Sequence, residues 1–219
     1  MSQIFHFENC FSTNDEILSL LNEDESTAVF TFNQTKGRGQ YGNIWKVIPN
    51  QNLAYSIAIK TSNIRISDTF LNYYTAIIVR DFLANLTNAS CKIKWPNDII
   101  LNGKKGCGIL IEKKKFENVE YYIIGIGINV LQTDFSNLPK AGSVLTATDL
   151  SFDLKEFTNQ FHQYLISRIQ DINPEEEILN IYNQSLFRKD EISVFQKNNL
   201  RQNGIIKNAD KNGFLWIDL

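Results

Sequence analysis

Lys94-Trp95-Pro96-Asn97-Asp98 is followed, after a short interval, by Lys105-Gly106-Cys107-Gly108, and these two stretches decide the fold. Asn102-Gly103 lies between them and is the strongest two-residue hairpin signal, so strands are predicted over residues 99–101 and 107–111. Two lysines, an amide and a carboxylate then gather around one short hairpin. Cations beside glycine backbone suit a reaction that handles a nucleotide phosphate and a second small anion.

Composition narrows the class of protein. The 219 residues fit one medium domain, or one domain with a small appendage. A net charge of -2 gives no reason to expect general nucleic-acid binding. Cys10, Cys91 and Cys107 are widely spaced, which disfavours a disulfide framework or a cysteine zinc site and favours a reducing compartment. The sequence shows no signal peptide and no 18-residue apolar run, so we expect a cytoplasmic protein with no membrane partner.

Hydrophobic periodicity outlines an α+β fold. Helical spacing predicts helices over residues 67–86, 154–168 and 174–184, and a shorter one that Ser12 or Thr13 caps. Predicted strands, besides the hairpin, span residues 4–7, 27–32, 53–59, 91–95 and 121–130. We therefore expect a central mixed β-sheet with helices packed on one face, formed by residues 1–184. Residues 185–219 read as a small β appendage with strands at 191–196, 204–207 and 213–219.

A second glycine-rich loop lies upstream of the hairpin. Gly37-x-Gly39-x-x-Gly42 matches the dinucleotide-binding fingerprint in its letters but not in its context, because residues 43–50 show no helical period and include Pro49. A nicotinamide or flavin dehydrogenase is therefore disfavoured, and a Walker motif is absent from the sequence. Glycines around Arg38 would let backbone amides approach an anion, although a mobile surface loop has the same composition.

Six short motifs appear in an order that resembles the biotin–protein ligases, also called biotin–[acetyl-CoA-carboxylase] ligases. They are Ser12-Thr13-Asn14, Gln34-x-x-Gly37-Arg38-Gly39, Trp45, Lys94-Trp95-Pro96-Asn97-Asp98, Lys105-x-x-Gly108-Ile109-Leu110 and Gly125-x-Gly127-Ile128-Asn129. The resemblance covers residues 5–135 closely. It implies the fold that biotin and lipoate ligases share with class II aminoacyl-tRNA synthetases, followed by a small SH3-like β domain.

The resemblance also implies an activity. Members activate biotin with Mg-ATP to biotinyl-5′-AMP and pyrophosphate, and then transfer biotin to a lysine of a biotin carboxyl carrier domain. By resemblance the catalytic residues are Lys105, Asp98 and Arg38. The biotin-binding residues would be Ser12, Thr13, Asn14, Gln34, Arg38, Gly39, Gln40, Lys105 and Gly108. The ATP-binding residues would be Gly37, Trp45, Lys94, Asn97, Ile128 and Asn129. Mg²⁺ would be held mainly by the ATP phosphates, and no protein ligand set is assigned to it.

Each of these residues also has a plain structural interpretation. Lys105 alone would be a solvated hairpin lysine, and Asp98 could simply pair with Lys94. Trp45 is of a type more often found in a core than against a cofactor. The run Lys113-Lys114-Lys115 is expected to be a solvated strand end. The order of the motifs, rather than any single one, favours the functional interpretation.

The sequence departs from the family in three places. Gln40 and Asn43 stand where much of the family has arginine, so we hypothesise weaker retention of the acyl-adenylate. The motifs begin close to the N-terminus, which predicts a monofunctional ligase without a DNA-binding domain. The β appendage is either truncated or reduced. A homodimer through sheet edges stays open, as do two rival functions: a lipoate–protein ligase and a non-catalytic biotin-binding module.

Overall fold

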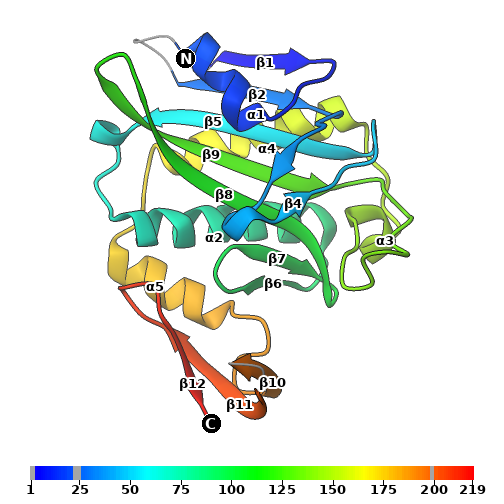
Figure 1. Cartoon of the computed structure of the whole chain (residues 1–219), viewed down its shortest axis with the longest axis vertical. Helices are drawn as coiled ribbons and strands as arrows, with labels where there is room; N and C mark the ends of the chain where they lie inside the picture. The colour runs from blue at the N-terminus through cyan, green and yellow to red at the C-terminus, as the bar shows by residue number, and fades with distance from the viewer. Residues whose placement is uncertain (1–2, 22–25, 198–199) are drawn as a thin grey trace.

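A seven-stranded sheet forms the centre of the computed structural model, which describes residues 3–21, 26–197 and 200–219 (Figure 1). The strand order is β1-β2-β5-β9-β8-β7-β6. β1 is parallel to β2 and the other neighbours are antiparallel, so the predicted mixed sheet is confirmed. The strands are β1 (Gln3–Phe7), β2 (Thr27–Thr31), β5 (Asn52–Lys60), β6 (Cys91–Lys94), β7 (Asp98–Leu101), β8 (Lys104–Phe116) and β9 (Val119–Asn129).

The predicted hairpin is present as β7 and β8. Asn102 and Gly103 have φ of 43° and 84°, so two consecutive left-handed residues make the turn. β8 is much longer than the predicted strand 107–111, because Lys113, Lys114 and Lys115 continue its ladder with β9. A charged run can continue a strand when alternate side chains leave the buried face.

Helices α2 (Asp68–Thr87) and α4 (Leu154–Ile169) cover one face of the sheet, and α5 (Glu175–Gln184) packs against α2 (Figure 1). All three helices contribute side chains to the main hydrophobic core. Alternate residues of the central strands, such as Tyr55 and Ile124, bury their side chains against these helices. The three long helices are confirmed. A short helix, α3 (Val144–Thr148), was not predicted; in the structure Ser143 and Thr146 form a capping box at its start, without the Glu or Gln of the usual sequence signature.

A second, smaller core lies on the other face. The helix α1 (Thr13–Glu16) and the 3₁₀ turn η1 (Ile17–Leu20) pack there, with Ile17 against Val29 and Ile123. The prediction that helices occupy one face is therefore wrong for this segment. Ser12 occupies the N-cap position, as predicted, but its side chain makes no cap hydrogen bond.

The C-terminal strands β10 (Ile192–Lys197), β11 (Leu200–Ala209) and β12 (Leu215–Asp218) form a separate antiparallel sheet, as predicted in outline. Asn183 of α5 bonds to the backbone of Ala209 in β11, and Trp95 Nε1 donates at 3.2 Å to Gly213 O in the turn before β12. The domain boundary at 184/185 stays a prediction, and α5 ends at Gln184. A further 3₁₀ turn, η3, spans Thr61–Asn63. Among the described residues, no helix has both the length and the apolar character needed to cross a membrane.

Candidate active site

Three glycines clear a strip of the sheet face opposite the long helices. Gly125 and Gly127 alternate with core residues along β9, and Gly108 of β8 pairs with Gly127. Because side chains alternate between the two faces, all three glycines point to the same side. A cleft of about 230 Å³ lies over this strip. Glycine at these positions therefore makes room for groups that lie against the sheet.

The glycine-rich loop forms one wall of the cleft. β3 (Gly37–Arg38) pairs with β4 (Ile44–Trp45), and the turn η2 (Gln40–Gly42) joins them. Tyr41 and Gly42 have φ of 57° and 76°, which closes this narrow ribbon. At Gly37 a Cβ would lie 2.5 Å from the backbone carbonyl oxygen of Trp45, so only glycine fits there without a backbone shift. The stretch predicted as a loop is thus a short hairpin that passes in front of β8 and β9 (Figure 1).

Trp45 of β4 lies flat on the glycine strip. A Cβ at Gly108 would be 3.1 Å from Trp45 Cζ3, and one at Gly127 would be 2.6 Å from Trp45 Nε1. The indole Nε1 is buried and has no hydrogen-bond partner in the described part of the chain. A buried donor without a partner costs free energy, so this edge of the cleft is ready to accept a hydrogen-bonding group.

Lys105 and Asp98 form an ion pair at the hairpin end of the cleft. Lys105 Nζ lies 2.7 Å from Asp98 Oδ1, and Lys94 Nζ lies 3.9 Å from Asp98 Oδ2. The Lys105 ammonium also lies 5.6 Å from the centroid of a Trp45 ring. The Lys105 side chain is 36% exposed, so it reaches solvent through the cleft. Asp98 therefore pairs more closely with Lys105 than with Lys94, the partner considered from the sequence.

The backbone of Lys105 is held from the side. Its N–H donates to Lys140 O at 2.8 Å, and its carbonyl accepts from Gly142 N at 3.0 Å. Asn129 Nδ2 in turn donates to Gly142 O at 3.0 Å. Asn129, on the neighbouring strand β9, thus holds the segment around Gly142, and this segment holds the backbone of Lys105.

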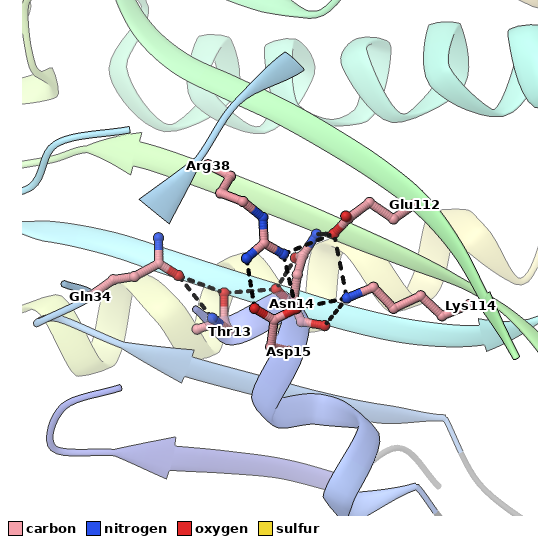
Figure 2. Close-up of polar contacts among 8 residues, drawn as sticks. Thr13, Asn14, Asp15, Gln34, Arg38, Glu112 and Lys114 are labelled. Atoms are coloured by element: carbon pink, nitrogen blue, oxygen red, sulfur yellow. Dashed lines mark hydrogen bonds and ion pairs between the residues drawn. The ribbon is translucent and has the colours of Figure 1, made fainter. Parts of the chain in front are cut away.

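A chain of polar contacts lies along the wall at the opposite end of the cleft, where Asn14 and Gln34 line it (Figure 2). Gln34 Oε1 accepts from Thr13 N at 2.8 Å and lies 3.2 Å from Thr13 Oγ1. Ser56 Oγ lies 2.7 Å from Thr13 Oγ1 and donates to Asn14 Oδ1 at 2.6 Å. Asn14 Nδ2 donates to Glu112 Oε2 at 2.7 Å. Each group fixes the next, so this end is ordered before any ligand arrives.

Arg38 and Lys114 share the carboxylate of Asp15 beside this chain of contacts (Figure 2). Arg38 makes two contacts, Nη1 to Oδ2 at 2.6 Å and Nη2 to Oδ1 at 2.9 Å. Lys114 Nζ lies 2.8 Å from the same Oδ1. The bonded Arg38 guanidinium, assisted by Lys114, holds the pKa of Asp15 well below its usual range, against a smaller opposing effect of burial.

Most of the residues assigned from the sequence lie around this one cleft. Those that line it are Ser12, Asn14, Gln34, Arg38, Gly39, Gln40, Trp45, Lys94, Asn97, Asp98, Lys105 and Gly108. Thr13 and Gly37 lie behind the lining, where they position Gln34 and Trp45. Asn97 is buried, and its Nδ2 donates to Ile109 O.

Two residues assigned to ATP lie elsewhere. The side chain of Ile128 points into the core beneath the helices and is 0% exposed, because strand alternation turns it away from Gly127. The Ile128 side chain therefore does not face the cleft, and the ATP-binding role of this residue stays a prediction. Asn129 faces the correct side of the sheet but bonds to the segment at Gly142.

Four residues of the polar chain were missed: Asp15, Ser56, Glu112 and Lys114. Lys114 is not a solvated strand end, since its side chain is 21% exposed and bonds to Asp15 and to Asn14 O. The signal was present in the alternation of β8, where Gly108, Glu112 and Lys114 fall on one face. Asp15 was visible as an acid in the first helical turn.

The fold is that of solved biotin protein ligases. The biotin protein ligase from Aquifex aeolicus in complex with biotin and ATP superposes with a TM-score of 0.82 at 22% identity, over 97% of this chain and 90% of that one. A biotin protein ligase from Leishmania major gives 0.71 at 20% identity, covering 98% and 93%. At these identities the likeness establishes the fold alone.

Sequence comparison then gives the family. Residues 8–129 match the Biotin/lipoate A/B protein ligase family, and because this is more than half of the chain, the protein belongs to that family. The bifunctional ligase/repressor BirA of Bacillus subtilis is 36% identical over 112 residues, 51% of this chain and 34% of that protein. The biotin–[acetyl-CoA-carboxylase] ligase of Paracoccus denitrificans is 33% identical over 137 residues, 61% of this chain and 55% of that protein. The matched region thus spans between a third and little more than half of these relatives.

Proposed function

We propose that this protein activates biotin with ATP to biotinyl-5′-AMP and transfers biotin to a lysine of a biotin carboxyl carrier domain. One observation carries the proposal: Lys105 and the loop that contains Arg38 line the same cleft, over a strip of glycines. The names of the similar proteins, which are biotin ligases, support the same substrate.

The end of the cleft at α1 suits the vitamin. A ureido ring needs donors and acceptors fixed within a small slot, and the ordered groups of Ser12, Asn14 and Gln34 line this end. Gln34 and Asn14 are held by Thr13, Ser56 and Glu112, so they would bind with little loss of side-chain entropy.

The hairpin end suits the reacting phosphate. Activation joins the biotin carboxylate to the α-phosphorus and releases pyrophosphate, which brings two anions together in the transition state. The Lys105 ammonium would stabilise that charge, with Lys94 beside it. Mg²⁺ carried by the ATP phosphates would offset the charge of the leaving pyrophosphate. Among the described residues, no group of three or more His, Cys, Asp or Glu could hold a metal ion.

Asp98 would act in the transfer step. The acceptor lysine must lose a proton as its amine attacks the acyl carbon and AMP leaves. The Asp98 carboxylate faces the cleft beside Lys105 and would accept that proton or orient the amine. The loop over the cleft would keep water from the mixed anhydride in the interval.

The decisive experiment is biotin-dependent exchange of radiolabelled pyrophosphate into ATP by the purified full chain. We expect exchange with biotin and none without it, because the first half-reaction is reversible on the enzyme. Absence of exchange when biotin and Mg-ATP are saturating would contradict the proposal.

Two rival functions are separated by further measurements. A lipoate–protein ligase would gain thermal stability from lipoate rather than from biotin, because only a ligand of the native state raises the midpoint. A non-catalytic biotin-binding module would bind biotin without releasing pyrophosphate from ATP. Such a module would also keep its function in Lys105→Ala, whereas the proposed ligase would lose it.

A further inference from the structure

The glycine-rich loop is tied to the rest of the molecule through one charged side chain. Between Gly37 and Trp45 the sequence contains a single charged residue, Arg38, with Gln40 and Asn43 as neutral neighbours. Arg38 directs its guanidinium to α1, where both Nη atoms contact the Asp15 carboxylate, at 2.6 Å and 2.9 Å. A two-point contact of this kind fixes direction as well as distance.

Asp15 is itself held in place from the sheet. Lys114 of β8 contacts Asp15 Oδ1 at 2.8 Å and Asn14 O at 3.2 Å, so it fixes both the side chain and the turn that carries it. Glu112 lies 3.6 Å from Arg38 and 3.8 Å from Lys114, and two positive and two negative groups therefore share this corner. The loop is joined in this way to α1 and to β8 at once (Figure 2).

We propose that Asp15 is a positioning residue that acts through Arg38 to hold the β3–β4 ribbon over the cleft. The second part of this inference rests on the proposed function: the same contact sets how long the enzyme retains biotinyl-5′-AMP. Arg38 and Asp15 are 42% and 46% exposed, so water screens the pair and the hold is modest and reversible. A reversible hold suits a loop that must open for substrate entry and for transfer.

The first test measures loop opening in the full chain without ligands. Trypsin cleaves after Arg38 when the ribbon opens, and Asp15→Asn is expected to accelerate this cleavage about tenfold. Arg38→Lys keeps the charge and the cleavage site but loses the two-point contact, so it should also be cleaved faster. Asp15→Glu should restore most of the protection.

Asp190→Asn is the matched control, because Asp190 forms an exposed ion pair with Lys207 at 3.4 Å in the C-terminal sheet. It is expected to be cleaved after Arg38 at the wild-type rate. If Asp15→Asn has a lower melting temperature, its faster cleavage could reflect global unfolding. The cleavage rate of Arg38→Lys then decides whether the ion pair holds the ribbon. Wild-type cleavage rates in both variants would overturn the inference.

The second test measures retention of the intermediate. After loading with biotin and ATP, Asp15→Asn is expected to release biotinyl-5′-AMP about tenfold faster than wild type, with a higher KM for biotin and little change in kcat for exchange. Equal release rates would overturn the link to retention. If wild type forms no adenylate, the proposed function fails, whereas trypsin cleavage still judges the hold on the loop by itself.

Discussion

The two ends of the cleft are built differently. At the α1 end, Asn14 and Gln34 have fixed protein partners, and charges of both signs are paired. At the hairpin end, the buried Trp45 Nε1 has no partner among the described residues, and Lys94 is 59% exposed. A preordered end selects its ligand by shape, whereas an end with an unused donor and an exposed cation is completed by the ligand. The comparison predicts that the two ends will respond differently to substitution.

Lys105→Ala is the change with the largest expected effect. It removes the cation nearest the proposed site of charge development, so kcat for biotin-dependent exchange should fall by at least about 10²–10³-fold. The fold should survive, because the side chain is 36% exposed and the backbone bonds of Lys105 remain. Lys207→Ala, which removes a lysine from an exposed ion pair, is the control. Exchange at nearly the wild-type rate in Lys105→Ala would contradict the proposal that Lys105, at the hairpin end, stabilises the transition state of adenylation.

Asp98→Asn should separate the two half-reactions. The amide keeps the shape but cannot take a proton, so single-turnover transfer to the acceptor lysine should slow by about 10²-fold. Adenylation should slow less, because Lys105 loses a partner at 2.7 Å but keeps its charge. Rapid-quench measurement of each step checks this. Equal losses in both steps would mean that Asp98 serves only to position Lys105.

The hairpin end was largely predictable from the sequence. Asn102-Gly103 requires a tight turn, which pairs Lys105 with Ile100, and from there the long Lys105 side chain reaches the Asp98 carboxylate. The glycines of β9 likewise predicted a part of the sheet face without side chains, where a ligand or another segment of backbone can approach closely. The turn and the glycine strip each depend on residues that are neighbours in the sequence, so both can be predicted from the sequence.

The α1 end was harder to predict because its contacts are long-range. Asp15 and Lys114 lie far apart in the sequence, and nothing near either residue indicates that they meet. The run of three lysines suggested a solvated surface, although only strand register decides which lysine faces the cleft. The direction of the Ile128 side chain was hard to predict for the same reason, since a shift of one residue along β9 moves a side chain to the other face.

Two neighbouring glycines offer the sharpest test of the comparison. A Cβ at Gly125 would meet the Asn14 carboxamide, and one at Gly127 would meet the Trp45 ring. Gly125→Ala should therefore raise the KM for biotin, and Gly127→Ala the KM for ATP, each by about tenfold, with about 1–3 kcal/mol lost from stability. Steady-state kinetics with each substrate varied in turn provides the measurement. If both variants raise the same KM, the cleft has no division into two ends.

The smallest predicted effect concerns acid and comes from neither end. His162 of α4 is 3% exposed, with Nδ1 2.8 Å from the Tyr55 hydroxyl, and its burial lowers the pKa of His162 below 6.5. As the pH falls, the unfolded chain therefore takes up a proton on His162 before the folded chain does. The unfolding free energy should for this reason decrease below about pH 6.5, by at most about 1.4 kcal/mol per pH unit. The pKa of Asp15 is lowered, so this carboxylate stays charged throughout that window and does not contribute to the slope.

Urea denaturation at pH 7.5 and 5.5 measures this slope. His162→Gln should flatten it, because glutamine does not titrate, and His6→Gln is the matched control because it replaces the other histidine of the sequence and retains His162. Persistence of the full slope in His162→Gln would place the acid-sensitive group elsewhere, with the carboxylates of the cleft as the next to examine. If the slope disappears in His162→Gln, the pH profiles of the two half-reactions can be measured in this variant. They can then be assigned to groups in the cleft rather than to loss of the folded state.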